Sequence, residues 1–308
     1  MAPTLDPTLD VVFKLLFAAP KNRDILIALL QDVLAPERPI VRVDVLNPEI
    51  DKEQVDDRGL ILDILAVHDD GSKTNIEMQA RNRGDTQRRT LYDWARLYRD
   101  GIQRGDSFSD LTPCRVIFFL SFTLFEERRR LHSTFRVLET HDGFPLNGDL
   151  ELHFVELTKL RKDPVDADDP AAAWAGFFAA KSSEERRRLS MSDPYIDKAR
   201  AALEELSRDP KNQALVRARE DALRIYQFET ASLKRKVMAE GLAEGRQKGL
   251  AEGAALQRRS SIQLLCRVLE IDWTPERARQ VDELGGEVLE ALEQHLATHR
   301  AWPQDSGD

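Results

Sequence analysis

A single carboxylate interrupts an otherwise apolar run in the first third of the chain. In Leu60-Ile-Leu-Asp63-Ile-Leu-Ala-Val67, seven of the eight residues are apolar. Such a run is typical of a β-strand that is buried on both faces. An ionised carboxylate is costly there unless neighbouring groups compensate its charge. The fold must therefore bring a partner for Asp63 into its core.

Polar residues on the following segment can meet this carboxylate. Residues 73–80 are predicted to form the next strand. Within it, Glu77 and Gln79 are two positions apart, so their side chains share one face of the strand. Asn75 lies on the same face.

The length of the connecting turn decides whether Asp63 reaches that face. A two-residue loop at 70–71 would pair Asp63 with Met78, on the wrong face. A three-residue loop at 69–71 would instead pair Asp63 with Glu77. Glycine at the third loop position, Gly71, favours the longer loop, because that residue adopts a left-handed conformation.

In the second register two carboxylates stand opposite each other, about 5 Å apart at Cβ, and like charges so placed repel. A divalent cation would convert this repulsion into binding. Two carboxylates, a backbone carbonyl and water suit Mg²⁺ or Mn²⁺. In the alternative interpretation, Asp63 is hydrogen-bonded in the core and Glu77 lies on an exposed edge.

The order of predicted elements indicates an α/β fold. An amphipathic helix is predicted over residues 85–105, with Leu91, Trp94 and Tyr98 on its apolar face. From Ala171 onward no strand pattern occurs, and the rest is predicted to be helical. The other predicted elements are helices near 8–19 and 24–34 and strands at 40–46, 115–122 and 150–157. The predicted divisions are an α/β domain over 1–165, a helical extension over 166–235 and a helical tail over 236–308.

Composition narrows the class of protein. Hydrophobic residues make up 42% of the 308, enough for a sizeable core, and only two cysteines occur, which indicates a reducing cytoplasm. No apolar stretch reaches 18 residues, so no membrane partner is expected. The net charge of −9 argues at first against a nucleic-acid partner. However, residues 81–104 hold seven arginines against three aspartates, directly after the Glu77 strand.

Several motifs, taken in order, resemble the transposase-associated, recombination-promoting nucleases of the PD-(D/E)XK superfamily. The resemblance covers about residues 6–230. The motifs are Asp10-Val-Val-Phe-Lys14-Leu-Leu-Phe17, Leu-Asp63-Ile-Leu, Ile-Glu77-Met-Gln79, Arg88-Arg89-Thr-Leu-Tyr92-Asp-Trp-Ala-Arg-Leu-Tyr98 and Phe154-Val-Glu156-Leu-Thr-Lys159.

The resemblance implies a nuclease-like core of a central mixed sheet with flanking helices, and it assigns roles to residues. Asp63 and Glu77 would bind Mg²⁺ or Mn²⁺ through their carboxylates, and Met78 through its carbonyl oxygen. Gln79 stands where most of the superfamily has lysine. It can orient a water molecule but supplies no positive charge, so the identity of the general base is open.

Further residues border this site in the family's pattern. Asp10 would be an outer metal ligand; alternatively, Asp10 and Lys14 form a surface ion pair one helical turn apart. Arg88, Arg89 and Lys14 would contact the phosphates of DNA, because they are cations close to the metal strand.

The tail carries one short repeat, with glycines every four residues from Gly241 to Gly253. Each glycine weakens a helix, so the segment is a hinge between two parts or, alternatively, a face for self-association into a homo-oligomer. The predicted function is that of a metal-dependent DNA endonuclease acting in recombination, transposition or defence. The alternative is a catalytically degenerate nuclease fold that acts as an interaction module through its helical half.

Overall fold

The computed structural model describes residues 4–47, 50, 63–82, 84–160, 169–191 and 193–303. The chain forms two compact units, Met1–Tyr226 and Gln227–Asp308. Three parts of the sequence predictions lie outside the described residues: positions 60–62 of the apolar run, Arg83 of the basic segment, and residues 161–168, which include the predicted boundary at 165.

Within the described residues of the first unit, six strands form one mixed sheet in the order β1-β2-β3-β4-β6-β5. The central strands β3, β4 and β6 are parallel, whereas β1, β2 and β5 join their neighbours antiparallel. The strands are β1 (Val43–Val45), β2 (Asp63–His68), β3 (Lys73–Gln79), β4 (Cys114–Leu120), β5 (His132–Phe135) and β6 (Leu150–Glu156).

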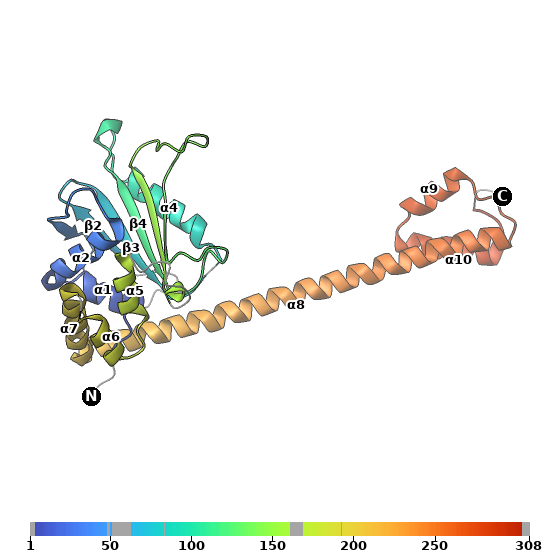
Figure 1. Cartoon of the computed structure of the whole chain (residues 1–308). Helices are drawn as coiled ribbons and strands as arrows, with labels where there is room; N and C mark the ends of the chain where they lie inside the picture. Colours follow the sequence, from blue (N-terminus) through green and yellow to red (C-terminus); the bar gives the residue numbers. More distant parts are fainter. Residues whose placement is uncertain are drawn as a thin grey trace. The chain divides into compact units, whose positions relative to one another are not determined.

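Helices cover both faces of this sheet (Figure 1). On one face the core joins Ile64, Ile76 and Ile117 to the helices α1 (Asp10–Phe17), α2 (Arg23–Leu34), α5 (Ala171–Ala179) and α7 (Pro194–Arg208). On the other face, α4 (Thr86–Arg99) packs through Trp94 over a smaller cluster around Phe118 and Phe154. Burial from both sides explains why β4 is apolar along almost its whole length.

The predicted hairpin register is confirmed. His68 donates its backbone N–H to Ser72 at 2.9 Å, which closes a three-residue loop, and Gly71 has φ +81°. Asp63 therefore pairs with Glu77 across β2 and β3. Because Glu77 in turn pairs with Phe118 of β4, both carboxylates lie on the face that α4 covers.

The predicted absence of strands after residue 171 is confirmed for the part of the chain that the structure describes. Strand β5 was not predicted, and the helical tail breaks near Pro275 and again at Leu284 and Gly285. The other helices are η1 (Pro20–Asn22), η2 (Phe108–Asp110), η3 (Leu157–Lys159), α6 (Ser183–Leu189), α8 (Pro210–Val268), α9 (Pro275–Glu283) and α10 (Gly286–His299).

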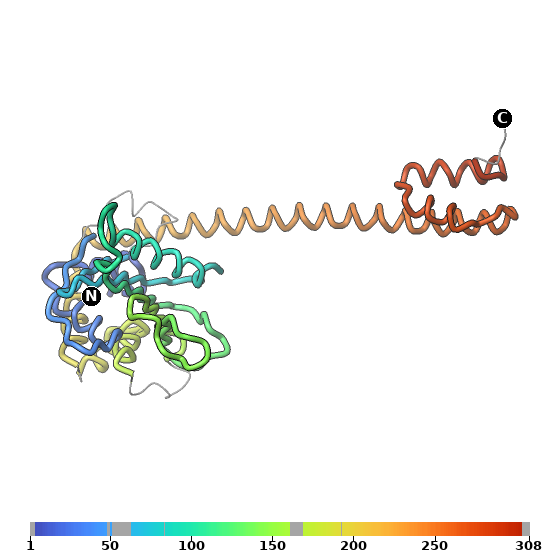
Figure 2. Tube along the Cα trace, turned by 90° about the horizontal axis from the view of Figure 1, so that it is seen from above, coloured from blue at the N-terminus to red at the C-terminus, as the bar shows by residue number. Residues whose placement is uncertain are grey.

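The second unit has a small core of its own. The end of α8 packs against α9 and α10, and these three segments lie side by side in Figure 2. Arg258 donates to the carbonyl oxygen of Gly286 at 2.9 Å, and Arg259 to that of Val281 at 3.1 Å. The repeat from Gly241 to Gly253 lies within α8, as does the predicted boundary at residue 235. No helix among the described residues is long and apolar enough to cross a membrane.

Candidate metal centre beneath helix α4

Asp63 is the first residue of β2 and is held in place by the loop after β1. The side-chain amide of Asn47 donates to the Asp63 carboxylate at 3.1 Å. Asn47 also accepts the backbone N–H of Leu65 at 2.8 Å, so it bridges two positions of the strand. No role in the site was predicted for Asn47 from the sequence. It fixes the Asp63 side chain at the edge of the candidate site.

Glu77 is almost completely enclosed, with 3% of its surface exposed. Two side-chain amides of its own strand hold its carboxylate, Asn75 at 3.2 Å and Gln79 at 3.1 Å. Burial, together with the nearby charges of Asp93 and Asp63, raises the pKa of Glu77 to about 7 against the opposing effect of the Gln79 hydrogen bond. Its anionic form therefore lacks sufficient compensation from the protein.

Asp93 of α4 is an acidic residue of this site that the sequence analysis missed. The predicted apolar face of the helix was wrong in part, since Leu91 is 54% exposed, whereas Thr86 and Thr90 are buried. The inward face is thus rotated toward Asp93, whose side chain is only 12% exposed. Burial raises the pKa of Asp93, and the charge of Asp63 adds to this effect.

A second buried glutamate shows what a structural carboxylate looks like in this fold. Glu156 at the end of β6 accepts the backbone N–H groups of Leu124 at 2.6 Å and Phe125 at 3.1 Å, and it pairs with Lys159. Its charge is therefore met by a cation and two backbone donors. Glu77 has no such cation at hydrogen-bond distance among the described residues, which distinguishes the two glutamates.

Met78 and Gln79 are the last two residues of β3, and their side chains lie on opposite faces of the sheet. Gln79 is buried on the face of Glu77, and its amide nitrogen is the one that donates to that carboxylate. The side chain of Met78 packs into the core on the opposite face. The contribution of the Met78 carbonyl oxygen to a metal site stays a prediction.

The first helix uses its predicted site residues differently. Asp10 and Lys14 are both buried, so the alternative of a surface ion pair is wrong. Arg219 of α8 is fully buried and holds the Asp10 carboxylate, with its shortest contact at 2.6 Å. A role of Asp10 as an outer metal ligand stays a prediction. With 1% of its surface exposed, Lys14 does not present its ammonium group to solvent, which speaks against its predicted contact with DNA.

The two arginines predicted to contact DNA differ in their surroundings. Arg88 is exposed on α4. Arg89 is partly buried at 29% side-chain exposure, and its Nε atom lies 3.5 Å from an oxygen of Asp93, one helical turn ahead. Arg89 is also near enough to lower the pKa of Glu77.

The donor set fits a hard divalent cation. Two carboxylates, Asp63 and Glu77, meet across the hairpin and repel each other without one. Oδ1 of Asn75 is buried and accepts no hydrogen bond from any described residue, so a further oxygen on this face is unsatisfied. In the described ranges no group of three acidic, histidine or cysteine side chains is preassembled for a metal. Main-chain oxygen and water would have to complete the coordination.

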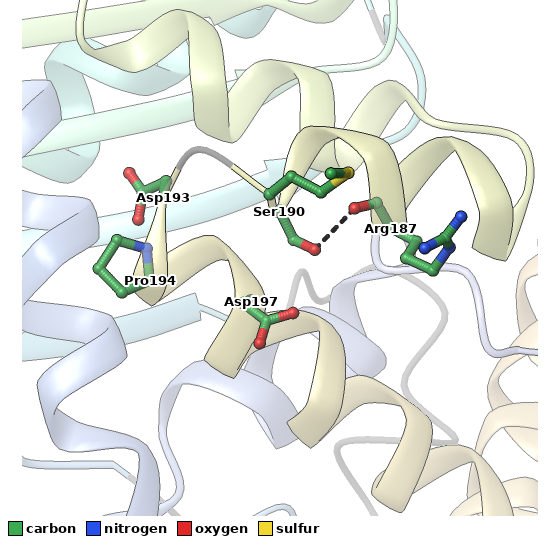
Figure 3. A pocket seen from close by; sticks show the side chains of 6 residues that line it. Arg187, Ser190, Asp193, Pro194 and Asp197 are labelled. Carbon is green, nitrogen blue, oxygen red and sulfur yellow. Dashed lines mark hydrogen bonds between the residues drawn. The ribbon is translucent and has the colours of Figure 1, made fainter.

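A shallow pocket lies elsewhere, between α6 and α7 (Figure 3). Its polar side chains already have partners within the protein. Ser190 donates to the carbonyl oxygen of Arg187 at 2.9 Å, Asp193 accepts backbone N–H groups at the start of α7, and Asp197 accepts from Arg200. This pocket shares no residue with the candidate metal centre.

The mixed sheet, with an aspartate at the start of β2 and a Glu-x-Gln pattern at the end of β3, is the arrangement of a PD-(D/E)XK nuclease-like core. The description "PD-(D/E)XK nuclease family transposase" matches residues 7–229, and the chain belongs to this family. Nucleases of this superfamily generally use divalent metal ions. No curated protein and no solved structure matches the chain.

Proposed function

We propose that this chain is a metal-dependent endonuclease that hydrolyses phosphodiester bonds of DNA in recombination, transposition or defence against mobile elements. One observation carries the proposal. Glu77 is buried, has a pKa raised to about 7, and faces Asp63 across the hairpin. The folded state gains nothing from such an arrangement unless a cation binds there.

Each residue of the candidate metal centre has a proposed role in the hydrolysis. Asp63 and Glu77 would hold Mg²⁺ or Mn²⁺ with their carboxylates, together with the Met78 carbonyl oxygen. When bound, the ion polarises the scissile phosphate and lowers the pKa of a coordinated water. Gln79 donates its amide N–H to Glu77, which leaves its amide oxygen to orient the attacking water. The water oxygen bonds to phosphorus as one ester bond breaks, its released proton passes to solvent, and the departing sugar oxygen takes up a proton.

The proposal predicts metal-dependent cleavage. Supercoiled plasmid incubated with the purified chain should be nicked in Mg²⁺ or Mn²⁺ and stay intact in EDTA or Ca²⁺, since the proposed chemistry needs an ion that activates water. Gel electrophoresis of the plasmid forms measures this. Nicking that is equally fast in EDTA would contradict the metal requirement. A chain that binds these ions but cleaves neither DNA nor RNA would favour the alternative, a degenerate nuclease fold that acts as an interaction module.

The proposal extends to the assembly and location of the protein. The four glycines from Gly241 to Gly253 have open space around their Cα atoms, and neighbouring leucines such as Leu242 and Leu250 are largely exposed. We propose that this part of α8 meets a second copy of the chain. Both cysteines, Cys114 and Cys266, are free thiols, which supports the proposed cytoplasmic location.

Removal of the tail tests the assembly. Deleting residues 239–308 is expected to lower the mass in sedimentation velocity from that of an oligomer to that of a monomer, because the helical face for the second copy is lost. Replacing Gly245 and Gly249 with leucine in the full chain provides the matched comparison. These side chains would keep two helices apart without removing the second unit. An unchanged mass in both variants would contradict self-association through α8.

A further inference from the structure

The candidate metal centre lacks the positive charge that a lysine usually provides. Gln79 occupies that position. Its side chain is buried, and its amide N–H donates a hydrogen bond to Glu77. An amide can orient water but cannot neutralise the charge that develops on a phosphate in the transition state. A cation from another element would have to act there if the centre is catalytic.

Arg89 is the described cation whose position suits this role. It lies on the inward side of α4, partly buried at 29% exposure, with Asp93 as its neighbour one turn later. The helix α4 packs over the face of the sheet on which Glu77 lies, because Glu77 pairs with Phe118 and Trp94 of α4 packs over the cluster around Phe118. The adjacent Arg88 and the later Arg96 and Arg99 are exposed, as expected for side chains on the outer face.

Asp93 orients this arginine. The contact of 3.5 Å uses the Nε atom of Arg89, and the two terminal nitrogens form no hydrogen bond with a described residue. Those nitrogens form the planar fork that matches the oxygens of a phosphate. The same oxygen of Asp93 is buried and lacks a hydrogen bond of good geometry from the described residues. The buried charge of Asp93 therefore has Arg89 as its nearest compensation.

We propose that Arg89, positioned by Asp93, supplies at the scissile phosphate the positive charge that Gln79 cannot provide. This inference rests on the proposed nuclease function. It makes Arg89 a catalytic residue and Asp93 a positioning residue. It also separates Arg89 from Arg88, which contacts DNA away from the reacting phosphate.

Removing the positive charge at position 89 and restoring one at position 79 tests the proposal. Arg89→Met should lower the single-turnover nicking rate at saturating DNA by about 10²–10³-fold, the usual effect of losing one donor to the developing charge. Arg99→Met, the matched control, removes an exposed arginine of the same helix and should leave that saturated rate within a few fold. Gln79→Lys in the Arg89→Met chain should restore the rate at least tenfold, because lysine returns a cation to the site.

Other outcomes separate this inference from the proposed function. If the unchanged chain does not nick DNA with any metal, the proposed function fails. If it nicks and Arg89→Met nicks equally fast, only the present inference fails. A folded Gln79→Lys/Arg89→Met chain that recovers nothing would also overturn it. If the double variant does not fold, Arg89→Lys provides a second test. It keeps the positive charge at position 89 and should retain far more activity than Arg89→Met. Thermal melting verifies that each variant is folded.

Discussion

Asp63→Ala and Glu77→Ala are each expected to lower metal-dependent plasmid nicking by about 10³-fold or more. A bound metal ion contributes several kcal/mol of transition-state stabilisation, and each 1.4 kcal/mol is about tenfold in rate. Because the two carboxylates act through one ion, the double variant should be little worse than either single variant. Initial nicking rates at saturating Mg²⁺ measure the effect.

An acidic residue in the same hairpin provides the matched control. Asp69 lies in the loop between β2 and β3 and is exposed. Asp69→Ala changes the net charge as much as Asp63→Ala does and should leave nicking within a few fold. Nicking that persists at the unchanged rate in Asp63→Ala or Glu77→Ala would show that the active centre lies elsewhere.

Glu77→Gln is expected to stabilise the metal-free protein at pH 8 by about 3 kcal/mol. The pKa of Glu77 is raised from 4.5 to about 7, and each unit corresponds to about 1.4 kcal/mol. The folded state therefore holds a proton that the unfolded chain has already lost. Stability is full below about pH 4.5 and falls as the pH rises through 7. The glutamine mimics the protonated acid and escapes this loss.

Chemical unfolding in EDTA at pH 5 and pH 8 measures this difference. The stabilising effect of Glu77→Gln should be small at pH 5 and appear at pH 8. Glu151 provides a control of opposite sign. Burial by itself would raise the pKa of Glu151, but His153, Arg136 and Arg115 lower it to about 2. Glu151→Gln should therefore destabilise the protein at both pH values. An equal effect of Glu77→Gln at both pH values would contradict the raised pKa.

A buried carboxyl group whose charged form is destabilised in this way is typical of a functional site. Glu77 and Glu156 are both buried on the same face of one sheet. Only Glu156 has a cation and backbone donors that compensate its charge. The contrast suggests that the surroundings of Glu77 are adapted to bind a ligand. Replacement of Glu77 should therefore lower the nuclease activity and at the same time stabilise the metal-free protein.

Much of the site could be predicted from local sequence. Because side chains alternate along a strand, the pairing of Asp63 with Glu77 follows once the length of the turn is known. That length depends on Gly71, whose φ of +81° suits the third position of a three-residue loop. The apolar runs that became β2 and β4, and the absence of strands after residue 171, also follow from local pattern.

Contacts distant in sequence could not be predicted in this way. Asp10 had a local candidate partner in Lys14, but the structure pairs its carboxylate with Arg219, 209 residues later. Arg219 lies in a long charged helix, where arginines are usually exposed. Its burial depends on how the first turns of α8, which belong to the first unit, pack against α1.

Asp93 shows most clearly the difference between what the local sequence determines and what the tertiary structure determines. In the sequence it is one of three aspartates among seven arginines, a pattern typical of a solvated helix face. The hairpin carboxylates were determined by alternation and by one glycine, because a strand register is a local property. Only the packing of α4 over the sheet turned Asp93 and Arg89 toward them. The rotation of a helix about its own axis is set by the surface it covers, and here that surface combines the apolar cluster around Phe118 with the carboxylate of Glu77.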